Sequence, residues 1–191
     1  MILTGTGFAG KVYKAYDDKQ RKYFALKQYR LPDAFHIPLF TRSDLSRQLK
    51  ELLHPGLCRI FDIYICDEPC VVMDYIEGES LRSYLENHAV DIQRGLEIAR
   101  DVLLALEELH RHGIYYGDLK PDNVMISREG RVCLCDFSGS NYNGFRFDEV
   151  TIIEYKFKSP EKNWENLIDF RSDIYGGDFD EGATSGYFCA N

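Results

Sequence analysis

Several stretches of the chain alternate apolar and polar side chains with the two-residue period that is typical of β-strands. A polar stretch at residues 17–20 separates two of these runs and predicts a hairpin connection. Glycines interrupt the first run, so we expect a strand followed by a turn there. The runs that predict strands cover residues 1–10, 11–16, 23–29, 57–65 and 70–75.

Helical periodicity replaces this alternation in the region before the fourth run. Leu45, Leu49 and Leu52 recur at spacings of four and three, which predicts a short helix that ends before Pro55. The stretch before this helix contains Pro38 and is expected to be a loop.

The clearest helix is predicted over residues 91–112. Asp91 can cap its start, and Gly113 is placed to close it in a left-handed conformation. A hairpin follows, with strands over residues 124–126 and 132–137, so the order of elements indicates an α+β fold. The apolar residues assigned to one stripe of the helix are Ile92, Leu96, Ala99, Leu103, Leu106 and Leu109.

The composition is that of a soluble globular chain with one core, since 45% of the 191 residues are hydrophobic and 28% are charged. No apolar run approaches the roughly 18 to 20 residues of a membrane-spanning helix. The first residues also lack the basic start and apolar core of a signal peptide. We therefore expect a cytoplasmic protein, with the nucleus as a further location, and no membrane partner.

Charge and cysteine content narrow the function classes further. The 31 acidic residues outnumber the 23 basic ones, and the formal charge is −8. With no basic run to override this charge, a nucleic-acid partner is not expected. Six cysteines occur without a CxxC pair, which favours reduced thiols over disulfides or a zinc site. Nothing in the sequence indicates an oligomeric state.

Candidate chemistry begins with Gly5, Gly7 and Gly10, which precede Val12. Glycines at this spacing let backbone N–H groups approach phosphate oxygens, although a glycine-rich hairpin that binds no ligand has the same pattern. Lys27 is a lone cation in an apolar strand. Because its neighbours look buried, an anionic partner is a better interpretation than a solvated edge position.

The most specific pattern is a polar loop with Asp118, Lys120 and Asn123, followed by Asp136 eighteen residues after Asp118. Carboxylate and amide oxygens suit a hard cation, and a carboxylate can also act as a base. The lysine offers positive charge to a phosphoryl group in transfer. Each of these residues alone is common in turns, but their joint spacing favours a site.

Five motifs occur in order along nearly the whole chain: GTGFAGKVYKA, FALK, YGDLKPDN, CDFSG and KSPE. In these motifs the chain resembles the eukaryotic protein kinase family. The resemblance implies a bilobal α+β fold, with a small antiparallel β N-lobe in residues 1–76 and an incomplete, mainly helical C-lobe in residues 77–175. A disordered tail is expected over residues 176–191.

The resemblance also implies how a nucleotide is held. Gly5, Gly7 and Gly10 would cover the phosphates of ATP, and Lys27 would hold the α- and β-phosphates. Met73 resembles the gatekeeper of the adenine pocket, and residues 74–76 resemble the hinge. The residues that would surround the adenine are Val12, Ala25, Met73, Asp74, Ile76 and Met125.

Catalytic roles follow from the same resemblance. Asn123 and Asp136 would bind Mg²⁺, and Asp118 would accept or orient the hydroxyl group of a protein substrate. Lys120 resembles the lysine of serine/threonine kinases that contacts the γ-phosphate.

Three positions depart from the family pattern. Leu45 occupies the helix position that usually holds the glutamate partner of the lysine, and Asp44 would reach Lys27 only after a register shift. Gly117 replaces an arginine that in many relatives binds a phosphorylated activation segment, so switching by that route is not expected. Ser138 replaces the glycine of the metal-binding motif.

The end of the chain departs further. Residues 172–175 resemble the start of a long buried helix of the C-lobe, but a glycine-rich stretch follows up to residue 191. Glu161 would then lack the arginine that it normally meets, and a buried acid without a partner is costly. We therefore expect a truncated kinase chain.

Three functions are compatible with these patterns. The leading interpretation is an ATP- and magnesium-dependent serine/threonine protein kinase. Leu45, Gly117 and the expected truncation instead favour a pseudokinase-like module that binds nucleotide or a partner without useful turnover. The catalytic loop also resembles that of small-molecule phosphotransferases, although Lys120, Pro121 and the KSPE motif argue against this class.

Overall fold

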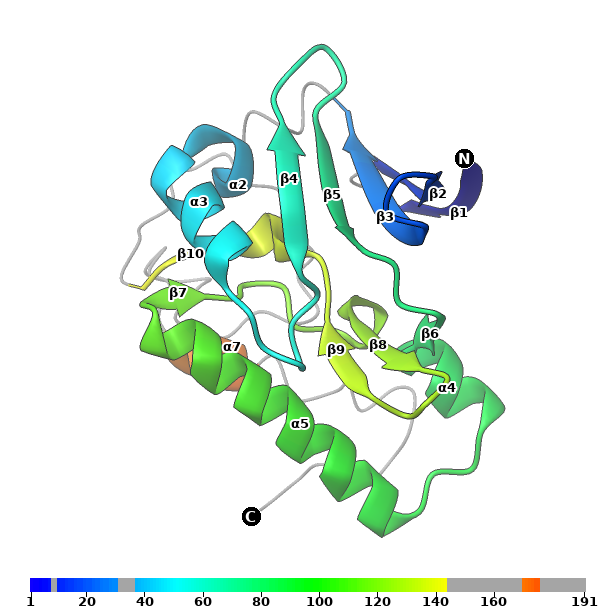
Figure 1. Ribbon diagram of the computed structural model, residues 1–191. Coiled ribbons are helices and arrows are strands. Elements are labelled where there is room, and N and C mark those ends of the chain that lie inside the picture. Colours follow the sequence, from blue (N-terminus) through cyan, green and yellow to red (C-terminus); the bar gives the residue numbers. More distant parts are fainter. Residues whose placement is uncertain (8–9, 31–36, 144–169, 176–191) are drawn as a thin grey trace.

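The N-terminal part of the chain is a five-stranded antiparallel sheet (Figure 1). The computed structural model describes residues 1–7, 10–30, 37–143 and 170–175. Within these residues the strands of the sheet lie in the order β1-β2-β3-β5-β4. They are β1 (Ile2–Gly7), β2 (Gly10–Asp17), β3 (Lys22–Tyr29), β4 (Ile60–Tyr64) and β5 (Cys70–Asp74).

These strands match the predicted runs closely. β2 and β3 pair in continuous register along their whole lengths, and the predicted hairpin joins them. β4 begins at Ile60, three residues later than predicted, because Leu57 instead forms a parallel bridge with Leu134.

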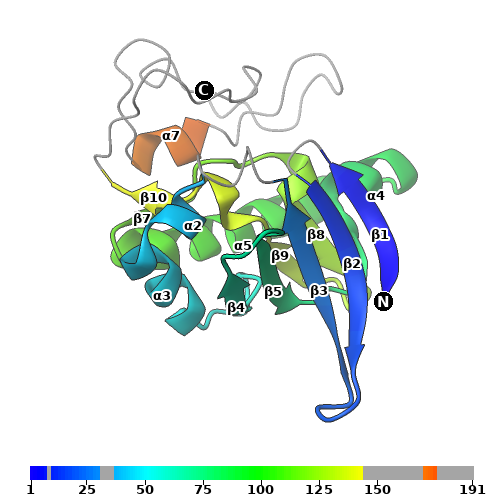
Figure 2. The same cartoon turned by 90° about the horizontal axis from the view of Figure 1, so that it is seen from above.

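Two helices, α2 (Pro38–Thr41) and α3 (Ser43–Glu51), lie on the β4 side of the sheet, far from β1 (Figure 2). α3 confirms the predicted short helix and buries Leu45 and Leu49. The expectation of a loop at Pro38 is wrong. A proline suits the first turn of a helix because the N–H group that it lacks would have no helical partner there.

The second part of the chain is mainly helical and carries a small sheet in the order β6-β8-β9, which packs against α5 (Figure 1). The predicted hairpin is present as β8 and β9, and α7 contains the predicted helix start at residues 172–175. β6, α4, β7 and β10 were not predicted, since such short elements show little period. The elements are β6 (Gly78–Ser80), α4 (Leu81–Asn87), α5 (Ile92–Arg111), β7 (Ile114–Tyr115), β8 (Val124–Ser127), β9 (Val132–Leu134), β10 (Asn141–Tyr142) and α7 (Phe170–Tyr175).

Helix α5 has the predicted ends but not the predicted buried face. Asp91 accepts a hydrogen bond from Arg94 N at 2.7 Å, and Gly113 closes the helix with φ +71°. Ile92, Leu96 and Leu103 of the predicted stripe are 72%, 64% and 51% exposed. The buried residues are Ile98, Val102, Ala105, Leu106 and Leu109.

The error has a geometric cause. From Ile92 and from Ile98 alike, apolar residues recur at spacings of four, three and four, so helical periodicity supports two stripes. Leu96 and Ile98 are two positions apart, which places them about 200° apart around the helix. The pattern cannot decide between such faces, and packing against β9 selects the second one.

The other predictions about the chain as a whole have mixed outcomes. Cys58, Cys66, Cys70, Cys133 and Cys135 are free, as predicted, and Cys189 lies outside the described residues. The described helices include none that is both long and apolar enough to cross a bilayer. The predicted tail of residues 176–191 and Glu161 also lie outside the described residues. The antiparallel sheet and the helical part together form the expected bilobal α+β fold.

Candidate active site

Lys27 is held in an ion pair. It lies buried in β3, opposite Val12 of β2 and Val71 of β5. Its Nζ pairs with Oδ2 of Asp136, which follows β9. The interpretation that this lysine has an anionic partner rather than a solvated position is therefore confirmed, and the partner is the carboxylate of the CDFSG motif.

Both oxygens of Asp136 have partners. Oδ1 accepts hydrogen bonds from Ser138 N at 3.3 Å and from the Tyr29 hydroxyl at 3.4 Å. Burial alone would raise the pKa of Asp136, but the Lys27 ammonium and the contacts with Ser138 hold that pKa below its usual value. Burial, and then the charge of Asp136, raise the pKa of Tyr29, so its hydroxyl stays protonated and donates.

Asp44 does not pair with Lys27, so the alternative of a shifted helix register is wrong. Leu45 is 0% exposed and faces the core, which leaves Asp44 in solvent at the start of α3. The N–H of Leu45 lowers the pKa of Asp44, and the hydroxyl of Tyr142 lowers it further. Asp44 therefore does not replace the glutamate that the family pattern places on this helix as the partner of Lys27.

The catalytic-loop residues form a second polar cluster beside the 3-10 turn η1 (Pro121–Asn123). Asn123 Nδ2 donates to the backbone oxygen and to Oδ2 of Asp118, both at 2.8 Å. Lys120 Nζ lies 3.1 Å from Asp118 Oδ2. The three residues that the sequence placed in one loop are thus also in mutual contact.

Asp118 and Asp136 are close enough for their charges to interact. Burial, and then the negative charge of Asp136, raise the pKa of Asp118, although Lys120 and Asn123 oppose this shift. The loop that carries Asp118 and the loop that carries Asp136 therefore meet in one site.

Gly117 allows these two loops to approach. Its φ is +87°, and a Cβ at this position would lie 2.1 Å from the carbonyl oxygen of Gly139. Gly139 ends the 3-10 turn η2 (Phe137–Gly139), which follows Asp136. The arginine that the family pattern leads one to expect at position 117 is therefore incompatible with this backbone.

Asp173 anchors the catalytic loop from α7. It is 1% exposed and accepts hydrogen bonds from the backbone N–H groups of Tyr116 and Gly117, both at 2.8 Å. His110 Nε2 lies 2.9 Å from the same carboxylate. The sequence predicted a helix start at this aspartate but not its contact with the loop, which depends on residues more than 50 positions apart.

The three glycines of the first motif have different surroundings. A Cβ on Gly10 would lie 1.9 Å from the backbone oxygen of Gln28, so this glycine is needed where β2 passes β3. A Cβ on Gly5 would have no atom within 4 Å. Gly7 pairs with Gly10 at the end of the β1–β2 ladder. At Gly10, close strand packing is thus sufficient to explain the residue.

The residues expected around an adenine lie on neighbouring strands. Val12 pairs with Lys27, and Ala25 lies two residues before that lysine and pairs with Met73. Side chains alternate along a strand and match across a pair, so these four residues share one face of the sheet. The remaining three expected residues lie in and beyond the hinge: Asp74, whose side chain pairs with Lys22 at 2.6 Å, buried Ile76, and half-buried Met125 of β8.

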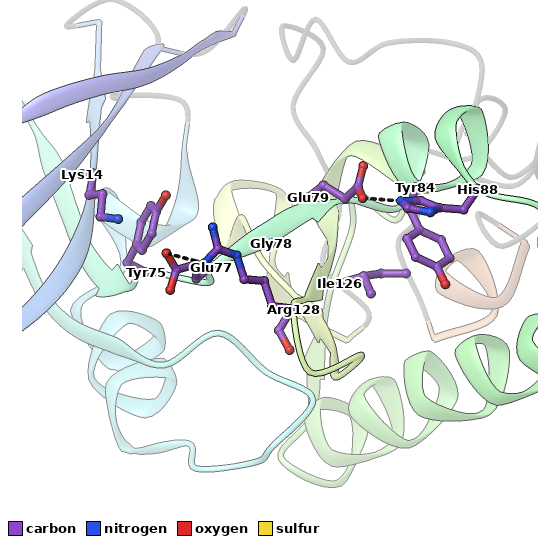
Figure 3. A pocket seen from close by; sticks show the side chains of 10 residues that line it. Lys14, Tyr75, Glu77, Gly78, Glu79, Tyr84, His88, Ile126 and Arg128 are labelled. Carbon is purple, nitrogen blue, oxygen red and sulfur yellow. Dashed lines mark hydrogen bonds and ion pairs between the residues drawn. The ribbon is translucent and has the colours of Figure 1, made fainter.

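A pocket of about 550 Å³ lies beside the hinge and is bordered by β6, β8 and Lys14 of β2, which pairs with Ala25 (Figure 3). In the β6–β8 pairing Glu79 is opposite Ile126 and Ser80 is opposite Met125, so Glu79 and Ile126 point away from the face of Met125. None of the predicted site residues lines the pocket. Its lining residues are Lys14, Tyr75, Glu77, Gly78, Glu79, Tyr84, His88, Ile126, Ser127 and Arg128.

Comparison with known proteins agrees with the fold. The family model described as protein kinase domain matches residues 2–176. The chain belongs to the protein kinase domain family.

Its curated relatives carry protein kinase names, and several of these names specify a serine/threonine-protein kinase. It is 34% identical over 141 residues to the cAMP-dependent protein kinase catalytic subunit PRKX of Homo sapiens, covering 72% of this chain and 39% of the relative. It is 31% identical over 187 residues to a probable serine/threonine-protein kinase of Streptomyces coelicolor, covering 91% of this chain and 28% of the relative. Serine/threonine-protein kinase PknB of Mycolicibacterium smegmatis is 28% identical over 185 residues, covering 91% and 30%. The chain thus spans less than half the length of each of these relatives.

Proposed function

We propose that this chain is an ATP- and magnesium-dependent protein kinase that transfers the γ-phosphoryl group to serine or threonine hydroxyls of cytoplasmic proteins. The observation that carries the proposal is the meeting of three distant segments in one polar site. Lys27 of β3 pairs with Asp136 after β9, and the charge of Asp136 acts on Asp118 of the catalytic loop. Ion pairs and pKa shifts of this kind are concentrated at functional sites.

The donor set suits magnesium. Mg²⁺ prefers hard oxygen ligands and is usually held by one or two carboxylates together with substrate phosphates. Asp136 supplies a carboxylate, and Asn123 directs its Nδ2 at Asp118, which leaves its amide oxygen for a cation. The described residues contain no metal-binding cluster of three His, Cys, Asp or Glu side chains, so phosphate oxygens would complete the coordination. The bound ion would neutralise charge on the phosphates.

The proposed nucleotide site lies on the sheet face that carries Lys27. Val12, Ala25 and Met73 offer apolar contacts for an adenine on that face, with Met125 from the other part of the chain. Asp74 and Ile76 would contribute backbone groups of the hinge. Lys27 would direct its charge at the α- and β-phosphates, and the loop of Gly5, Gly7 and Gly10 would cover them.

Asp118 is the proposed base or orienting group for the substrate hydroxyl. The pKa of Asp118 is raised toward neutral pH, which makes its carboxylate a better proton acceptor than that of an ordinary aspartate. Lys120, which contacts the same carboxylate, would offer positive charge to the γ-phosphate. Catalysis would then consist mainly of positioning and charge neutralisation.

A transfer assay tests this function. Purified chain is incubated with radiolabelled ATP, Mg²⁺ and a generic protein substrate, with the Asp118→Asn variant as the matched control. Incorporation of label into serine or threonine that depends on Mg²⁺ and on Asp118 is expected. Labelling of an amino alcohol but not of protein would instead support a small-molecule phosphotransferase.

A binding module without useful turnover is the second candidate, and burial of Leu45 at the usual glutamate position favours it. In this case Mg²⁺-dependent ATP binding would be measurable by calorimetry while no label is transferred to any substrate. The same preparation of the chain serves for both measurements.

A further inference from the structure

Tyr29 lies beside the ion pair of Lys27 and Asp136 and contacts both residues. It follows Lys27 by two positions in β3, so the two side chains share one face of the strand. Lys27 Nζ lies 4.8 Å from the centroid of the Tyr29 ring. The Tyr29 hydroxyl donates to Asp136 Oδ1 at 3.4 Å.

The Tyr29 ring is fixed by its surroundings. It is 4% exposed and meets Phe40 of α2 edge-on, with ring centroids 5.0 Å apart and planes at 76°. Its backbone N–H donates to Pro69 O at 2.8 Å, and its backbone lies against Gly10 of β2. Because the position of the ring is fixed, it can restrict the positions of the side chains that contact it.

We propose that Tyr29 is the positioning residue for Lys27 and Asp136 in this chain, in place of an acid on α3. The proposal rests on the function proposed above and deepens it. Leu45 and exposed Asp44 leave α3 without an acid near the lysine, whereas Tyr29 touches both members of the ion pair.

The hydroxyl acts on the carboxylate. Lys27 occupies Oδ2 of Asp136, while Tyr29 and Ser138 N occupy Oδ1, so the plane of the carboxylate is determined from both ends. Groups that hydrogen-bond to a metal ligand orient it and commonly change metal affinity 10- to 100-fold when removed.

The ring acts on the lysine. The face of an aromatic ring attracts an ammonium group without carrying a formal charge. Tyr29 can therefore restrict the direction of Lys27 without neutralising it, whereas a glutamate would compete with phosphates for the same charge. The positive charge of Lys27 would therefore be available to a nucleotide once a bound cation has taken over the charge of Asp136.

The Tyr29→Phe variant tests the role of the hydroxyl, since it keeps the ring and its packing. We expect the Mg²⁺ concentration for half-maximal ATP binding, measured by calorimetry, to rise about tenfold. ATP affinity without Mg²⁺ and the melting temperature should change little. Tyr23→Phe, on the same strand but beside Lys14, is the matched control and should leave the Mg²⁺ requirement unchanged.

The Tyr29→Leu variant tests the ring as well. We expect it to weaken ATP binding without Mg²⁺ about threefold to tenfold, because Lys27 loses the contact that directs it. An unchanged Mg²⁺ requirement in Tyr29→Phe, or an equal shift in Tyr23→Phe, would overturn the positioning role alone. Failure of the unmodified chain to bind ATP with saturating Mg²⁺ would overturn the proposed function and the positioning role together.

Discussion

The two sides of the candidate active site are built in different ways. On the catalytic-loop side, hydrogen bonds to charged groups determine the geometry, as where Asp173 accepts from two backbone N–H groups and Asn123 donates to Asp118. On the α3 side, Leu45 is buried in the core and Asp44 lies in solvent. Among the described residues, loops and strands therefore supply the charges at this site, while α3 supplies apolar contacts.

The largest effect is expected from the polar side. The Asp118→Asn variant should lower phosphoryl transfer about 10²- to 10⁴-fold, since a positioned base contributes that much. ATP affinity with Mg²⁺ should persist, because Asn123 and Lys27 remain. Transfer rates and calorimetric affinities measured on one preparation check this. Undiminished transfer would mean that the chemistry does not lie on the catalytic-loop side.

On the apolar side the expected effect is on stability. The Leu45→Ala variant should lower the free energy of unfolding by about 2–5 kcal/mol, as is usual when a buried leucine is truncated. Urea unfolding followed by circular dichroism measures this. Asp44→Ala, one position away and exposed, is the control and should change the urea midpoint much less than Leu45→Ala does, while the ATP affinity stays unchanged. A loss of ATP affinity in Asp44→Ala would contradict the assignment of α3 to packing.

A third pair of variants distinguishes the close contact between the Gly117 and Gly139 loops from the strain that a positive φ causes by itself. Gly117 and Gly113 both have positive φ, but only at Gly117 would a Cβ meet the backbone of Gly139. Gly113→Ala should cost about 1–2 kcal/mol from strain alone. Gly117→Ala should exceed that by about 1–3 kcal/mol because of the clash. Equal unfolding midpoints for the two variants would show that the loops can separate without cost.

The smallest effect is expected at the edge of the polar side. Arg82 of α4 makes hydrogen bonds of 2.8 to 3.0 Å with Asp122 in η1, but both side chains are nearly half exposed. Arg82→Ala should therefore lower the unfolding free energy by less than about 1 kcal/mol.

The difference in unfolding free energy between the unmodified chain and the Arg82→Ala variant should also depend on pH. The hydrogen bonds from Arg82 lower the pKa of Asp122, so the stabilisation is present above the unfolded pKa of an aspartate. It is lost as the pH falls through the lower folded value. A difference between the two proteins that grows on acidification would be inconsistent with this pair.

The sequence predicted the elements whose pattern is local. Strands β2 and β3, helix α3 and the β8–β9 hairpin show their period within a few residues. Ser80, which caps α4 by accepting from Ser83 N, was a readable but unused signal for that helix. The buried face of α5 was not predictable, because two apolar stripes fit one helix and only the neighbouring strand selects between them.

In the candidate site, too, contacts between sequence neighbours could be predicted, and contacts between distant segments could not. Asp118, Lys120 and Asn123 are neighbours in sequence, and their mutual contacts agree with their spacing. The partner of Lys27 is 109 positions away, and the hydroxyl of Tyr29 reaches across nearly the same distance. Tyr29 looked like an ordinary apolar strand residue, since nothing in its local pattern marks a contact with an acid of another segment.

The ion pair between Lys27 and Asp136 has a consequence for ligand selection. Its two charges balance each other, so a ligand that replaces the pair must bring a cation for the acid and an anion for the ammonium at the same time. A magnesium–nucleotide complex does this, whereas free ATP would leave the carboxylate exposed to its own negative charge. Under the proposed function, the ion pair would therefore favour binding of the complete magnesium–nucleotide complex over either of its components.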